Sequence, residues 1–366
     1  MDIAIVGGSA AGLFAALLLA RAGHQALVLE RDSLQPAPDV ESAAAAAFRP
    51  SAPQIVQPHI VMARCRQLLI EHLPDVYAGL LAAGVAEAPL RTQMPDSLPD
   101  TAAWPGDERL TPMMTRRSTV DWVLQRAAAA EPRVTVRFGV KVTGLLTASA
   151  GTGGRPPHVT GVRTGRGDVA ADLVVDATGR RSPIDDWLTQ IGARATATWR
   201  AECGIVHAIG DSVCTTNPTL GRGLALALSG AADLADTIGE NAACPAAQAL
   251  ALDRLVGAHV VPFYHDQAVI DAARLAMMRH TIFAAPPPPA PETPGRVTYS
   301  QLRAAASWDP TAFRAFWKIN GMVCPPGEVY TDPDVIACTQ ETLRRHGTAP
   351  PVAQPTHEQL LTALTR

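Results

Sequence analysis

The sequence predicts a doubly wound α/β fold, in which buried parallel strands deliver their turns to one edge of a sheet. The apolar run 3–6 leads into the small-residue turn Gly7–Gly12, and a run of helical composition follows. The strands predicted over residues 173–176 and 204–209 are mostly apolar and also end at small-residue turns. Sheets of this kind bind ligands beyond the carboxyl ends of their strands.

The opening turn has the residue types that a strand needs when it turns at once into a helix. Gly7 permits the tight turn, and Gly12 lets the helix begin close to the strand. Unpaired backbone N–H groups at the helix start favour a pyrophosphate. Ser9 stands where the usual G-x-G-x-x-G pattern has its second glycine, so the bare pattern is weak. The candidate pyrophosphate residues are Gly7, Gly8, Ser9, Ala10, Ala11 and Gly12.

A second apolar strand over residues 25–29 ends in Glu30, which lies 18 residues after Gly12. A carboxylate at this spacing accepts hydrogen bonds from a ribose diol. It would repel a 2′-phosphate, so FAD or NAD fits and NADP does not. Arg31 follows Glu30 and is a further candidate for the cofactor site. The alternative is an ordinary βαβ unit that carries glycines at its turn without a ligand.

Composition excludes several other classes of function. The 366 residues are 47% hydrophobic, enough for a substantial core, and the net charge of −3 argues against binding nucleic acid. The six cysteines are scattered, which indicates reduced thiols and no metal site. No apolar run reaches about 18 residues and no basic leader opens the chain, so we expect a cytoplasmic protein without a membrane span.

Three stretches together resemble the FAD-dependent monooxygenases with the p-hydroxybenzoate hydroxylase fold. They are residues 7–12 with Glu30, residues 176–183 and residues 210–223. More narrowly, they are similar to the bacterial epoxidase, hydroxylase and reductase group related to squalene epoxidase. Residues 117–122 are similar to that group's Arg-x-x-Leu-Asp-Trp helix start. The resemblance implies FAD contacts at Arg117, Val142, Gly179, Asp211, Pro218, Gly221, Arg222, Gly223 and Leu224.

Residue types support two of these assignments. Asp211 can accept a hydrogen bond from a ribityl hydroxyl, and we expect it to be more buried than Glu30. A helix opened by Asn217 and Pro218 would aim its positive end at the flavin pyrimidine edge. The alternatives are that Asp211 only caps this helix and that Arg117 is an ordinary surface arginine.

The chain departs from the resemblance in one respect. Asp176 and Asp211 are only 35 residues apart, whereas the family's interval holds most of a substrate domain. We therefore expect an FAD-binding domain over residues 1–240, with a β-meander and an insertion shortened at 184–203. A helical C-terminal extension over 241–366 would contain a proline-rich linker at 286–294.

These observations favour an FAD-dependent oxidoreductase of the flavin monooxygenase class. Epoxidation or hydroxylation of a small apolar or natural-product-like molecule is the expected reaction, with NADH or NADPH as a transient electron donor. The alternative is an FAD-binding subunit that is catalytically degenerate or needs a partner protein or second chain to cover its flavin. An NAD-dependent dehydrogenase is disfavoured because Asp211 would have no role. The sequence assigns no acid–base residue.

Overall fold

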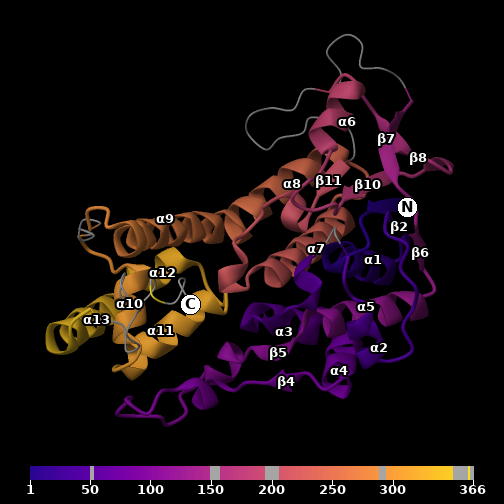
Figure 1. Ribbon diagram of the computed structural model, residues 1–366. Coiled ribbons are helices and arrows are strands. Elements are labelled where there is room, and N and C mark those ends of the chain that lie inside the picture. The colour runs from indigo at the N-terminus through magenta and orange to yellow at the C-terminus, as the bar shows by residue number, and fades with distance from the viewer. Residues whose placement is uncertain (50–52, 149–156, 194–205, 288–293, 349–361, 363–366) are drawn as a thin grey trace. The chain divides into compact units, whose positions relative to one another are not determined.

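Figure 1 shows the computed structural model of the chain, which describes residues 1–49, 53–148, 157–193, 206–287, 294–348 and 362. Most of the linker at 286–294 and the second half of the insertion at 184–203 lie outside the described residues. The chain divides into two compact units. Unit 1 contains residues 1–87 and 113–260, and unit 2 contains residues 88–112 and 261–366. The 1–240 extent of an FAD-binding domain stays a prediction.

Unit 1 is built on a five-stranded parallel sheet with β1 (Asp2–Val6) at its centre. On one side lie β10 (Leu173–Asp176) and β11 (Val206–Ala208), and on the other lie β2 (Gln25–Glu30) and β6 (Val134–Phe138). Strand order reverses at β1, so the doubly wound prediction is confirmed. Ligands of such sheets bind at this switch point, beyond the strands' carboxyl ends.

The two faces of the sheet are covered differently. Helix α1 (Ala10–Arg21) packs against α5 (Arg117–Ala130) and α7 (Gly223–Glu240), and Ile5 of β1 faces α1. Ala4 and Val6 alternate to the opposite face, where they join a second apolar cluster. Both faces of the central strands are therefore buried, which explains their continuous apolar runs.

The second face is covered by the predicted meander. Antiparallel strands β7 (Val142–Thr147), β8 (Val159–Thr164) and β9 (Gly167–Ala170) share a core with helix α6 (Ile184–Gln190). From the sequence, the turn at 165–168 predicts a further meander strand over residues 170–176. The structure corrects this, because the chain leaves β9 at Ala170 and enters the parallel sheet as β10.

A smaller antiparallel sheet has the order β3-β5-β4, with β3 (Pro58–Val61), β5 (Met113–Arg116) and β4 (Ala86–Glu87). The sequence pattern of residues 59–73 predicted one helix, but β3 occupies its start and the helix begins only at residue 63. The remaining elements of unit 1 are α2 (Val40–Ala45), α3 (Ala63–His72), α4 (Pro74–Ala82), α8 (Pro245–His259) and the 3-10 helices η1 (Pro53–Val56), η4 (Gly210–Ser212) and η5 (Pro218–Leu220).

Unit 2 joins the segment 88–112 to helices from the C-terminal part of the chain. Its elements are η2 (Leu90–Gln93), η3 (Asp107–Leu110), α9 (Val261–Phe283), α10 (Tyr299–Ala305), α11 (Pro310–Asn320), α12 (Pro326–Tyr330) and α13 (Pro333–His346). Leu98 and Leu110 of the segment pack with Phe313 of α11. Unit 2 thus has an apolar core of its own.

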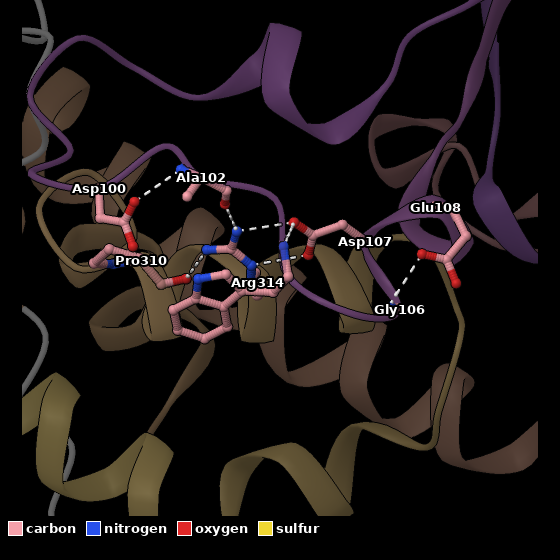
Figure 2. Close-up of polar contacts among 8 residues, drawn as sticks. Asp100, Ala102, Gly106, Asp107, Glu108, Pro310 and Arg314 are labelled. Carbon is pink, nitrogen blue, oxygen red and sulfur yellow. Dashed lines mark hydrogen bonds and ion pairs between the residues drawn. The ribbon is translucent and has the colours of Figure 1, made fainter.

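A buried ion pair fastens the segment to α11. The Arg314 guanidinium bonds both carboxylate oxygens of Asp107 at 2.8 Å, and its Nη2 donates to the Ala102 carbonyl at 2.7 Å (Figure 2). Its Cζ also lies 3.9 Å from the centre of the Trp104 ring. Arg314 is only 5% exposed, so this one side chain holds the segment through charge, hydrogen bonds and ring stacking.

Candidate cofactor site

The carboxyl ends of the parallel strands in unit 1 come together around the turn after β1. The Gly7 N–H donates to the Leu29 carbonyl of β2 at 2.9 Å, and the Ala177 N–H donates to the Val6 carbonyl at 2.9 Å. A Cβ added to Gly210, after β11, would lie 2.8 Å from the Ala11 Cβ. Three segments far apart in the sequence thus meet at the start of α1.

Backbone contacts explain the glycines of this turn. A Cβ at Gly12 would lie 1.9 Å from the Gly7 carbonyl oxygen, and a Cβ at Gly7 would lie 2.4 Å from the Ala177 carbonyl oxygen. Gly7 also has a φ of +109°, which L side chains rarely adopt. The first turn of α1 therefore lies directly against the β1 turn, as the spacing of the glycines predicts.

Glu30 is held at the end of β2 by backbone donors. Its Oε2 accepts from the Gly8 N–H at 2.7 Å and its Oε1 from the Asp32 N–H at 2.9 Å. The residue is 5% exposed, whereas Asp211 is exposed. The expected order of burial for these two carboxylates is therefore wrong, because the turn folds over Glu30. Each Glu30 oxygen keeps lone-pair capacity for a further donor.

Two guanidinium groups converge on Ser9, the residue just before α1. Nη2 of Arg117 lies 3.3 Å from the Ser9 Oγ, and Nη2 of Arg49 lies 3.4 Å from the same atom. Arg117 also bonds Asp121 one turn along α5, with 2.7 Å between its Nε and the carboxylate Oδ2. The structure thus brings Arg117 to the opening turn, and the same side chain forms an ion pair with Asp121. The sequence predicts Ser118 as the cap of a helix over 119–130, but the helix begins at Arg117, so Ser118 lies within it and Arg116 precedes its first turn.

Asp211 lies on the loop after β11, beside the loop after β10. The Gly179 N–H donates to the Ser212 Oγ at 2.8 Å and joins the two loops. Although the residue is exposed, neighbouring protein atoms partly desolvate the Asp211 carboxyl and raise its pKa, and the charges of Arg117 and Arg180 act in the opposite direction. Asp211 thus lies within electrostatic reach of the arginine that contacts Ser9.

Helix α7 begins later than we expected. Asn217 does act as a cap, since its side chain accepts from the Thr219 N–H, but it caps the short helix η5. Gly221 then takes a φ of +66°, and α7 starts at Gly223. A residue with a side chain rarely adopts this φ, and a Cβ at Gly221 would also lie 2.6 Å from the end of the Met62 side chain. The free N–H groups of α7 therefore begin at Gly223 and Leu224.

Three other residues that were predicted to contact FAD have buried side chains. Arg222 is fully buried and Leu224 is 2% exposed. Val142 is 7% exposed, with its side chain in the core between the two sheets, so only its backbone is available to a ligand. Arg31 and Pro218 are exposed, and Ala10 is buried at the first turn of α1.

The sequence analysis missed Arg49. This side chain is 4% exposed, and its Nε has no hydrogen-bond partner among the described residues. The sequence predicts a long loop over 33–58, a type of segment that often lines a site, but the position of one arginine within it gave no further signal. Local spacing did not show which part of that loop returns to Ser9.

His59 of β3 lies near the same arginine. Burial lowers its pKa to about 4, and the positive charge of Arg117 acts in the same direction, against Asp121. Burial also raises the pKa of the nearby Cys65 thiol to about 12 and that of Cys214 to about 11. The raised pKa values keep both of these thiols protonated near neutral pH, so neither Cys65 nor Cys214 is suited to act as a nucleophile.

Two negative findings apply to the described part of the chain. No cluster of three or more histidine, cysteine, aspartate or glutamate side chains could hold a metal ion there. Within the same residues, no helix combines the length and apolar character needed to cross a membrane.

Comparison with known proteins identifies the N-terminal segment. Residues 1–38 match the family model of the FAD binding domain, and this range contains both the Gly7–Gly12 turn and Glu30. The prediction of FAD as the cofactor is thereby confirmed. Protein Rv3254 of Mycobacterium tuberculosis is 31% identical over 222 residues, which are 56% of this chain and 43% of that protein. The chain thus spans less than half the length of this curated relative.

Solved structures identify the fold. PqsL of Pseudomonas aeruginosa, named a probable FAD-dependent monooxygenase, superposes with a TM-score of 0.53 and 14% identity. The match covers 76% of this chain and 96% of PqsL, and a complex of PqsL with 2-aminobenzoylacetate matches equally well. The superposition shows that the chain shares the fold of PqsL.

Proposed function

We propose that the chain is an FAD-dependent oxidoreductase of the flavin monooxygenase class, which epoxidises or hydroxylates a small apolar or natural-product-like molecule. The observation that carries the proposal is the convergence of the Gly7–Gly12 turn, Glu30, Arg117 and Asp211 at one edge of the sheet. When bound, FAD supplies the redox chemistry, which no protein side chain can perform.

The residues at this edge fit the parts of FAD. The N–H groups at the start of α1, with Ser9 and Arg117, are suited to the pyrophosphate, and Glu30 is suited to a ribose diol. Asp211 can accept from a ribityl hydroxyl. The N-terminus of α7 at Gly223 can stabilise negative charge on the pyrimidine edge.

An exposed apolar pair supports an apolar substrate. Ile60 of β3 and Met114 of β5 are paired across the small sheet and are 36% and 45% exposed. The Ile60 carbonyl oxygen lies 3.6 Å from the Cβ position of Gly221, in the turn that leads to α7. A small apolar molecule held over this pair would be next to the proposed flavin position.

The same pair favours a second candidate function. Exposed apolar surface rimmed by polar residues can also mark a site of protein–protein interaction. A partner protein or a second chain that covers Ile60 and Met114 would exclude water from the flavin, and the isolated chain would then bind FAD without oxygenating a substrate.

Oxygen uptake by the FAD-loaded chain tests the two candidates. With NADH or NADPH and a panel of small apolar molecules, the proposal expects substrate-dependent oxygen consumption and an oxygenated product. Oxygen uptake that yields only hydrogen peroxide with every substrate favours the partner-dependent subunit. The absence of any FAD-dependent oxygen uptake contradicts the oxidoreductase assignment.

A further inference from the structure

A cavity of about 400 Å³ opens at one edge of the parallel sheet in unit 1. Its lining comes from the end of β6, the edge strand of the sheet, and from the hairpin of β8 and β9. None of the described residues that line it belongs to the Gly7–Gly12 turn, and neither Glu30 nor Asp211 is among them. The cavity is therefore separate from the proposed cofactor site, and its volume is typical of sites for small organic molecules.

The lining of this cavity combines apolar and cationic side chains. Phe138, Val140 and Val169 supply the apolar part, and Arg137 and Arg166 supply two guanidinium groups. Both arginines are exposed, so they are accessible to a ligand from solvent. Apolar walls with a few charged groups are the usual composition of a site that binds a small amphipathic molecule.

The two guanidinium groups leave the cavity with a surplus of positive charge. Asp168 also lines the cavity, but its carboxylate lies 3.8 Å from Arg163, which is paired with it across β8 and β9. Neither Arg137 nor Arg166 forms an ion pair with another residue in the described part of the chain. An anion would therefore find two cations that no neighbouring carboxylate neutralises.

The hairpin turn fixes the backbone from which Arg166 extends. The Thr164 hydroxyl donates to the Gly167 carbonyl at 2.6 Å and accepts from the Arg166 N–H at 3.0 Å. The Arg166 guanidinium then lies against the chain that follows β6, because its Nη2 is 3.2 Å from the Cβ position of Gly139. The fold thus places this cation beside the end of the strand that carries Arg137.

We propose that this cavity binds a phosphate monoester that carries an apolar or aromatic group. Such a phosphate has a charge of about −1.5 to −2 near neutral pH, which two guanidinium groups can balance. Guanidinium groups bond phosphate oxygens in pairs, and the apolar lining would cover the rest of the ligand. The proposal goes beyond the oxidoreductase function and does not depend on it.

Calorimetric titration of the FAD-loaded chain with phenyl phosphate tests the two arginines. We expect Arg137→Gln and Arg166→Gln each to weaken binding about 10- to 100-fold. Arg166→Lys keeps the charge but loses the planar fork, so it should cause a smaller loss. Arg254→Gln makes the same change at an exposed arginine of α8 and should bind phenyl phosphate like the wild type.

Two further probes test the apolar part of the lining. Inorganic phosphate should bind more weakly than phenyl phosphate, because it leaves Phe138, Val140 and Val169 uncovered. Benzyl alcohol carries no charge and should also bind more weakly than phenyl phosphate. Equal affinities for phenyl phosphate and inorganic phosphate would overturn the proposed ligand class.

Three other outcomes would overturn the site itself. They are the absence of phenyl phosphate binding up to about 10 mM, binding that neither glutamine variant weakens, and release of FAD during the titration. In the last case the anion would occupy the cofactor site. A chain that takes up no FAD can be titrated in the same way, so failure of the FAD assignment is distinguishable from failure of this proposal.

Discussion

At the scale of single residues, Gly12 is the position where the site tolerates least change. A Cβ there would lie 1.9 Å from the Gly7 carbonyl oxygen. Gly12→Val should therefore push α1 away from β1 and abolish FAD binding, because the pyrophosphate loses its N–H donors. Titration of the apo chain with FAD, followed by flavin fluorescence, measures the loss.

Gly257→Val is the matched control. This glycine lies in α8 and has no heavy atom within 4 Å of its Cβ position, so the variant should bind FAD normally. Full FAD occupancy in Gly12→Val would show that the cofactor does not use this turn.

His59 makes stability depend on pH. Its folded-state pKa of about 4 lies below the usual 6.5. Between pH 6.5 and pH 4 the unfolded chain therefore binds a proton at His59 that the folded chain does not bind. This contribution is constant above pH 6.5, and stability falls as the pH drops from 6.5 towards 4. His59→Gln does not titrate and should lose less stability over that window, as urea unfolding at several pH values would show.

His158→Gln controls for the loss of any histidine, since His158 is exposed. Its stability should follow the wild-type pH dependence. If His59→Gln also follows that dependence, His59 titrates normally and is not buried beside Arg117.

The sequence predicted site residues where the chemistry is local. The spacing of Gly7, Gly12 and Glu30 lies within one βαβ unit, and the structure joins all three in the same turn. Arg49 was missed because its contact with Ser9 depends on how a long loop returns to the sheet. The burial of Asp211 was misjudged for the same reason, because burial depends on distant segments.

At the scale of elements, two sequence signals predicted a longer helix than the structure contains at that place. Asn217 and Pro218 do begin a helix, but it is a single 3-10 turn, because the chain turns at Gly221, which has a φ of +66°, before α7 begins. The pattern of residues 59–73 predicted a helix throughout. Pairing with β5 instead made its first residues a strand, and short apolar runs do not distinguish these outcomes.

The attachment of the segment 88–112 to α11 leads to a prediction about Arg314. Arg314→Met removes the charge and leaves the Asp107 carboxylate, whose side chain is 15% exposed, without its partner. Breaking a buried ion pair in this way should lower the free energy of unfolding by about 3–5 kcal/mol. Urea unfolding measures the change, and limited proteolysis should show earlier cleavage within 97–112.

Arg345→Met is the control for Arg314→Met. Arg345 pairs with Glu341 on α13, but its side chain is 67% exposed, so the loss should stay below about 1 kcal/mol. Equal losses for the two variants would mean that the Arg314 contacts do not hold the segment.

At the scale of the whole molecule, the doubly wound sheet was predictable because strands buried on both faces leave continuous apolar runs. The division into two units was not. Residues 88–112 contain few regular elements, and their membership of unit 2 depends on Arg314, more than 200 positions along the chain. The Gly7–Gly12 turn, Glu30 and Asp211 lie at the same edge of the sheet because β1, β2 and β11 are parallel strands of one sheet. The repeated pattern of an apolar strand followed by a small-residue turn did indicate this arrangement.

The most direct test of the account is the flavin content of the purified chain. We predict a flavin absorbance spectrum and one noncovalently bound FAD per chain, released as intact FAD on denaturation. Apo chain should take up FAD to the same stoichiometry. A colourless preparation that takes up no FAD on reconstitution would contradict the account, because the turn after β1 would then hold no cofactor.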